Sequence, residues 1–229
     1  KHVAQMLEDE DRSSGDYNSF WDERNYLATA DRITAGVWLH HGLAAFNVKP
    51  KQFDQLYRAM QAKSDAPIKL LIHPGDHMGF YEFMLDEHGS VLNYMHKWLD
   101  YYLYGIENNV LAEIPEVLLF NQANWQWETY ESWPISRDEY QKLYLVPGEN
   151  GQAGSLSYEA PATATASFKD DKQYRGAEEM EEWQEHFLNV AQIEAPSGLR
   201  LAYLTEPLAQ DVRINGPIKI TLNVTPDAG

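Results

Sequence analysis

The chain of 229 residues contains no cysteine, few basic side chains and no long apolar run. The lack of cysteine excludes disulfides and thiolate metal sites, and it is typical of a reducing compartment. No apolar stretch approaches the roughly 20 residues that span a bilayer, and no signal peptide is visible, so we expect no membrane association. Lys and Arg number 18 against 35 Asp and Glu, and the resulting formal charge of −17 argues against a nucleic-acid partner. The first residue is Lys rather than Met, so we expect the chain to be part of a longer protein.

The clearest pattern in the chain is a strand, helix and strand within residues 35–77. Residues 36–41 are continuously apolar, as parallel strands covered on both faces tend to be, and a second apolar run consists of Ile68, Leu70, Leu71 and Ile72. Pro50 suits the first turn of the helix between them, because its missing N–H group has no intrahelical partner at that position. The helix has one apolar face with i, i+3, i+4 and i+7 spacing, formed by Phe53, Leu56, Tyr57 and Met60.

His77 is the strongest candidate for a chemical role. It follows the second strand through a Pro-Gly-Asp turn, at the strand end where open α/β sheets bind their ligands. Strand, helix, strand and histidine is the last unit of an α/β-hydrolase, whose catalytic residues run Ser, then Asp or Glu, then His. However, no G-x-S-x-G motif occurs, and Ala44 and Ala45 stand where the acid is expected. From the spacing alone, a catalytic histidine and a loop histidine without a role both stay open.

The other histidines and acids near this pattern point to structural roles. His40, His41 and His73 lie at strand ends, and we interpret them as packed histidines. No H-E-x-x-H motif or other ligand spacing is present, so the sequence predicts neither a metal nor a cofactor. Asp76 is adjacent to His77 and badly placed to fold back onto it, and Asp54 lies within the helix, where we expect it to be solvated. Neither is a convincing replacement for the missing acid.

The pattern changes after Gly105, which we expect to end a helix that begins near Ser90. Short alternating segments separated by turn residues are typical of an antiparallel β-sandwich or jelly roll, and they occupy residues 117–120, 125–130, 142–146, 199–205 and 218–224. The acidic residues 178–186 are interpreted as a solvated surface. The predicted fold class is α/β, with residues 1–108 as the C-terminal portion of an α/β-hydrolase catalytic domain. Residues 109–229 are predicted to form a β-sandwich that is incomplete.

Four segments in combination resemble the X-prolyl dipeptidyl aminopeptidases of lactic acid bacteria: DRSSGDYNSFWDERNYL, HHGLAAFNVKPKQ, IHPGDH and GIENNV. The resemblance covers nearly the whole chain and corresponds to the C-terminal half of those enzymes. It implies a cytoplasmic serine exopeptidase of the α/β-hydrolase superfamily, related to the cocaine-esterase-like hydrolases. Such an enzyme releases Xaa-Pro dipeptides, so the expected partner is a peptide with proline at its second position. The resemblance also implies a homodimer and no cofactor.

Carried over from that family, His77 is the catalytic general base and acid, and Asn47 lines the substrate pocket. Ala45 falls on the position of the triad Asp, and the serine nucleophile is expected before residue 1, so the chain alone is expected to be inactive. The parent is then an inactivated paralogue, a variant fragment, or an enzyme whose acid comes from elsewhere in the fold. A hydrolase-fold binding protein and a related esterase are the alternative functions.

Aromatic side chains near the site are candidates for a small pocket that holds a proline ring. Phe46 directly follows the first strand's turn and is the residue that we assign to substrate binding. Trp21 and Tyr26 are the other two candidates, and for them we favour packing in the core.

Overall fold

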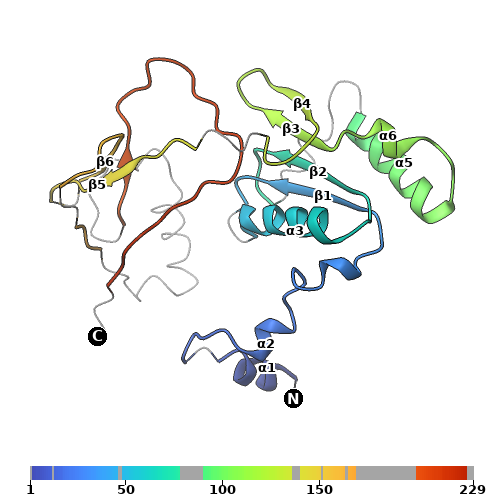
Figure 1. Cartoon of the computed structure of the whole chain (residues 1–229), viewed down its shortest axis with the longest axis horizontal. Helices are drawn as coiled ribbons and strands as arrows, with labels where there is room; N and C mark the ends of the chain where they lie inside the picture. Colours follow the sequence, from blue (N-terminus) through green and yellow to red (C-terminus); the bar gives the residue numbers. More distant parts are fainter. Residues whose placement is uncertain are drawn as a thin grey trace. The chain divides into compact units, whose positions relative to one another are not determined.

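The computed structural model describes residues 2–11, 13–45, 48–77, 90–135, 140–150, 152–162, 165–168 and 200–225. They belong to two compact units, one of residues 1–136 with 215–229 and one of residues 137–214. The first unit contains a four-stranded sheet and the second a three-stranded sheet (Figure 1). Within the described part of the chain, no helix combines the length and the apolar character that crossing a bilayer requires.

The first sheet confirms the predicted strand, helix and strand. Strand β1 (Val37–Gly42) pairs in parallel with β2 (Ile68–His73), and β2 pairs in parallel with β3 (Val117–Asn121). Strand β4 (Gln126–Tyr130) then closes the order β1-β2-β3-β4 by antiparallel pairing with β3. Strand β2, which leads to His77, is buried along its whole length.

Helix α3 (Pro50–Lys63) covers one face of this sheet, as Figure 1 shows in cyan. Pro50 lies in its first turn, as the sequence predicts, and its buried face consists of Phe53, Tyr57 and Met60. These side chains form one cluster with alternate residues of the strands, among them Leu70, Ile72, Val117 and Leu119. The side chains on the apolar face of the helix, spaced i, i+3 and i+4, therefore pack against every second side chain of the strands in one core.

Helix α5 (Ser90–Tyr104) covers the other face. Its Val91 packs with Leu71 and Leu118, which point away from α3 because successive strand residues face opposite sides. The short helix α6 (Val110–Glu113) packs against α5 around Trp98. Gly105 ends α5 with a φ of 66°, a left-handed conformation that glycine adopts without strain.

The sheet of the first unit extends further along the sequence than predicted. Strands β3 and β4 lie in the range assigned to the β-sandwich, but they pair with β2 and with each other. Val117, Leu118 and Leu119 fill the cores on both faces of the sheet, which explains why this apolar run continues the α/β layer. The hydrogen-bonded sheet therefore crosses residue 108, and the division of the chain into domains 1–108 and 109–229 stays a prediction.

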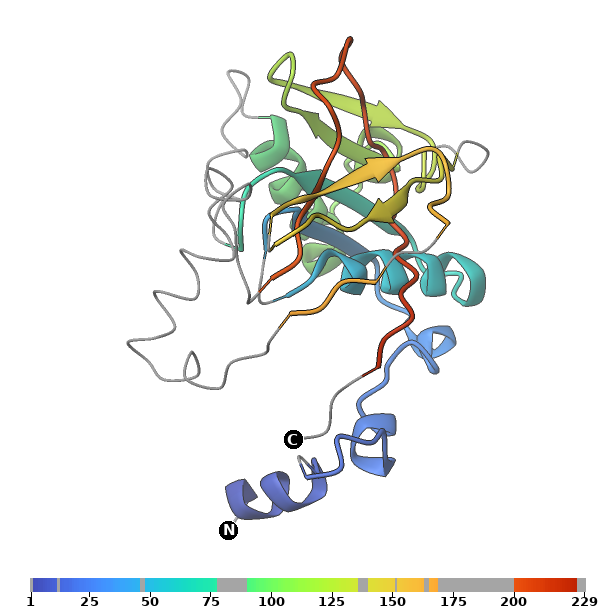
Figure 2. The same ribbon diagram turned by 90° about the vertical axis from the view of Figure 1, so that its left-hand side faces the viewer.

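The second unit has the sheet order β5-β6-β7, with β5 at Tyr144–Val146, β6 at Gly154–Ser157 and β7 at Tyr203–Leu204. Strands β5 and β6 are antiparallel, as Figure 2 shows, but β6 and β7 are parallel, so the expectation of purely antiparallel pairing is wrong. The parallel pair joins segments far apart in the sequence, and alternation does not encode such a pairing. A jelly roll stays a prediction, and residues 178–186 lie outside the described residues.

Residues 218–224 are described without a strand, which contradicts the prediction for that segment. Their alternating apolar side chains are 60–78% exposed, namely Ile218, Ile220, Leu222 and Val224. A period of two marks a segment that suits a sheet, but a strand forms only where a neighbouring backbone accepts its hydrogen bonds.

Near the N-terminus, helix α1 (His2–Asp9) is followed by the single turn α2 (Ser19–Asp22) and the 3₁₀ turn η1 (Ala30–Arg32). The Asn18 side chain caps α2 by accepting a hydrogen bond from the N–H of Phe20 at 3.0 Å. Phe20 is buried, but Trp21 is 40% and Tyr26 is 70% exposed, so the predicted core packing of these two is wrong. Adjacent residues of a helical turn point in different directions, so burying Phe20 turns Trp21 outward.

Candidate functional site

Two turns, one after β1 and one after β2, meet at the carboxyl ends of these strands. The N–H of Leu43 donates to the carbonyl of His73 at 2.8 Å, and the N–H of Ala44 donates to the carbonyl of Gly75 at 3.1 Å. A Cβ atom on Gly42 would lie 2.3 Å from the Gly75 carbonyl oxygen, so this approach requires glycine. The turn after β1 and the turn after β2 are therefore held against each other.

This contact joins the two turns that carry the positions that the sequence assigns to a catalytic histidine and its acid. Ala45 ends the first turn, with its N–H donating to the Gly42 carbonyl at 3.1 Å, and it is only 4% exposed. His77 ends the second turn and is exposed. Phe46 and Asn47, the predicted substrate-binding residues, lie outside the described residues.

His40 and His41 are both packed, as the sequence predicts, but on opposite faces of the sheet. The ring of His41 lies against Phe53 of α3, with centroids 4.8 Å apart. The ring of His40 lies on the α5 face against Trp38, with centroids 4.5 Å apart. His73 is 2% exposed at the end of β2, so two buried imidazoles, those of His41 and His73, and the partly buried His40 lie at the ends of the two strands that precede the turn of His77.

Burial makes the protonated form of these three histidines unfavourable. It lowers the pKa of His40 to about 4, with a smaller contribution from the charge of His73. Burial also lowers the pKa of His41, and the charge of His77 adds to this effect. The pKa of His73 is lowered by burial and by the charge of His41. At neutral pH the three rings are therefore uncharged.

Neither acid considered from the sequence lies ready to serve His77. Asp54 is 6% exposed, forms an ion pair with Arg58, and accepts a hydrogen bond from Nε1 of Trp133 at 3.1 Å. The expectation that Asp54 is solvated is thus wrong, because Trp133, 79 residues away in sequence, covers it. Asp76 is exposed beside His77. Its charge acts on His73, where it partly opposes the lowering of the pKa by burial and by His41.

The site offers an imidazole for proton transfer at a sheet edge, without a neighbouring carboxylate at position 45. In the described residues, no group of three or more His, Asp or Glu side chains is arranged to hold a metal ion. The sequence pattern found His77, but it gave no sign of the Gly42 contact or of the Trp133–Asp54 bond, since both depend on tertiary packing.

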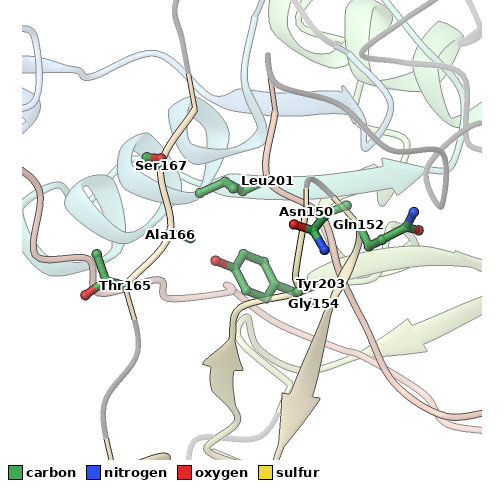
Figure 3. Close-up of a pocket in the computed structure, with 10 residues that line it drawn as sticks. Asn150, Gln152, Gly154, Thr165, Ala166, Ser167, Leu201 and Tyr203 are labelled. Carbon is green, nitrogen blue, oxygen red and sulfur yellow. The ribbon is translucent and has the colours of Figure 1, made fainter.

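The second unit carries a pocket of about 230 Å³ that the sequence did not predict. Figure 3 shows it between the loop that contains Asn150 and Gln152 and the strand that begins with Tyr203. Its walls carry no charged side chain and consist of Gly148, Asn150, Gln152, Gly154, Thr165, Ala166, Ser167, Leu201, Ala202 and Tyr203. No side chain among the described residues of this unit is fully buried, so these residues provide no core that fixes the walls of the pocket. We therefore take the two turns that follow β1 and β2, with His77, as the candidate site.

Comparison with protein families gives two matches along the chain. Residues 1–79 match the X-Pro dipeptidyl-peptidase (S15 family) model, and this range contains both turns of the candidate site. Residues 108–229 match the X-Pro dipeptidyl-peptidase C-terminal non-catalytic domain.

Two curated relatives agree with these matches. The chain is 31% identical over 98% of its length to the Xaa-Pro dipeptidyl-peptidase of Ligilactobacillus salivarius, and it spans 27% of that protein. It is 37% identical over 57% of its length to that of Lactiplantibacillus plantarum, of which it spans 16%. Among solved structures, an α-amino acid ester hydrolase matches 73% of this chain and 29% of its own, with 20% identity and a TM-score of 0.48. The chain thus spans about a quarter or less of these two curated relatives.

Proposed function

This chain belongs to the X-Pro dipeptidyl-peptidase family, and on that premise we propose that it is part of a serine exopeptidase that releases Xaa-Pro dipeptides from peptide N-termini. Residues 1–108 form the C-terminal portion of its α/β-hydrolase domain, and a β-sandwich of jelly-roll type follows. The observation that carries the proposal is His77 at the carboxyl end of an interior parallel strand, on a turn held against the turn of Ala45.

In the proposed reaction, His77 accepts the proton of a serine outside this chain and later gives it to the departing amine. A triad acid normally fixes the tautomer of the histidine and stabilises its protonated form. Position 45, where the family resemblance puts that acid, holds a buried methyl group. The proposal therefore includes a triad that lacks its usual carboxylate.

The proposed substrate is a peptide with proline at its second position, bound with contributions from Phe46 and Asn47. The proposed protein acts in the cytoplasm, and the absence of cysteine in this chain agrees with that reducing compartment. It is proposed to act as a homodimer. No metal or cofactor takes part in the proposed reaction.

The test is hydrolysis of Gly-Pro-p-nitroanilide by the gene product that carries this chain, expressed in full. We expect turnover that His77→Ala abolishes, and a rise in kcat of up to roughly 10⁴-fold in Ala45→Asp, because loss of a triad acid costs about that much. A substrate without proline at the second position serves as the specificity control. Turnover that persists in His77→Ala, or that ignores the proline, contradicts the proposal.

A second candidate is an inactive member of the fold that binds a partner without chemistry. One observation favours it: Ala45 at the position of the acid. If neither the unaltered protein nor Ala45→Asp cleaves any dipeptidyl anilide or simple ester, this second function replaces the first. Cleavage of esters with no peptide cleavage would instead indicate a related esterase.

A further inference from the structure

His41 is a buried imidazole beside the site that the proposed function leaves without a role. It is 9% exposed, and its ring packs against Phe53. Its Nε2 atom is buried and has no hydrogen-bond partner among the residues that the structure describes. A buried polar atom without a partner costs about 1–3 kcal/mol, so it calls for an explanation.

The contacts of His41 determine which of its nitrogens carries the proton. The ring makes a hydrogen bond with the backbone of Val48 that raises its pKa, and a bond of this sign is one that the ring donates to a carbonyl. Because Nε2 has no partner, the donor is Nδ1. Burial and the charge of His77 lower the pKa of the ring, which keeps it neutral at pH 7. The buried Nε2 atom is therefore a hydrogen-bond acceptor.

The backbone places this acceptor close to His77. His41 is paired in register with Ile72, next to the end of β2, and the following turns are joined by the bond from Ala44 to Gly75. The charge of His77 contributes to the lowered pKa of His41, in agreement with this placement. No hydrogen bond joins them in this structure, but His77 is exposed, and exposed side chains change rotamer within nanoseconds.

We propose that His41 positions His77, with Nε2 of His41 accepting a hydrogen bond from Nδ1–H of His77 in place of the carboxylate missing at position 45. This inference rests on the proposed function and names the positioning residue of the same site. A neutral imidazole fixes the tautomer and the orientation of its partner, as the triad acid does. It adds no negative charge, so it replaces only part of what a carboxylate supplies.

The test is the tautomer of His77, measured by ¹⁵N NMR on the labelled chain at pH 8. We expect Nδ1–H to predominate in the unaltered chain. In His41→Phe, which keeps a ring against Phe53 but removes the acceptor, we expect Nε2–H, the form that an unconstrained histidine favours. His40→Phe is the matched control, because His40 lies on the opposite face of the sheet, and it should leave the tautomer of His77 unchanged.

His41→Gln is the second variant, because its amide oxygen can accept the same bond and should restore the Nδ1–H form. The same tautomer of His77 in the unaltered chain and in His41→Phe overturns the proposal, as does an equal shift in His40→Phe. The measurement needs no turnover, so it is separate from the peptidase assay. A tautomer that depends on His41 in a protein without peptidase activity would uphold this inference and refute the proposed function.

Discussion

The partly buried His40 makes the stability of the first unit depend on pH. Its ordinary pKa of 6.5 falls to about 4 in the folded chain, because the ring lies among Trp38 and the α5 face of the sheet, with His73 nearby. The unfolded chain therefore binds more protons between pH 6.5 and pH 4. Stability is complete above pH 6.5 and is lost progressively as the pH falls toward 4.

The size of this loss follows from the two pKa values. Each pKa unit between the folded and the unfolded chain corresponds to ~1.4 kcal/mol. The drop from 6.5 to about 4 thus removes about 3 kcal/mol from the free energy of unfolding. This is a large part of the 5–15 kcal/mol that is typical of folded proteins.

The perturbation is His40→Gln, which keeps a polar side chain of similar reach and removes the titration. Urea unfolding followed by tryptophan fluorescence at several pH values between 4 and 7.5 gives the free energy of unfolding for both proteins. We expect the unaltered chain to lose about 3 kcal/mol more than the variant over this range. His96→Gln, on the exposed surface of α5, is the matched control and should follow the unaltered chain. Parallel curves for the unaltered chain and His40→Gln would refute the reasoning.

Two further predictions concern the packing around the site. Trp133→Phe removes the indole donor from the buried Asp54, so it should lower the free energy of unfolding, measured with urea, by about 1–3 kcal/mol. Trp125→Phe, at a 64% exposed position, is the control and should change this free energy little. Equal effects of the two substitutions would contradict the role of the bond. Gly42→Ala puts a Cβ atom 2.3 Å from the Gly75 carbonyl oxygen, so it should lower the free energy of unfolding by about 1–3 kcal/mol. It should also shift the backbone amide NMR resonances of both turns. Unchanged amide resonances would show that the turns are not in contact.

Local patterns in the sequence were sufficient to predict the layer that carries the candidate site. The apolar runs gave β1 and β2 to within one or two residues at each end, Pro50 marked the start of α3, and Gly105 marked the end of α5. In each case the signal is local: a run of apolar residues, a ring that lacks an N–H group, or a residue that accepts a positive φ. The position of His77 after a buried strand followed from the same signals.

Features that depend on distant partners could not be predicted in this way. Asp54 looks like a solvated residue until Trp133 covers it, and residues 117–130 look like the start of a sandwich until β3 pairs with β2. Residues 218–224 have the correct alternation, yet no pairing fixes them as a strand. Alternation indicates which residues share a face, but it does not identify the neighbouring strand.

The place of β2 inside the sheet has a consequence for how this protein can change over evolution. Its backbone is paired with β1 on one side and with β3 on the other, and all three strands belong to the first unit. The backbone hydrogen bonds that hold β2 in the sheet beneath His77 are therefore made within the first unit. A change confined to residues 137–214 alters none of these strand pairs, so evolution can modify that segment without changing how β2 is paired.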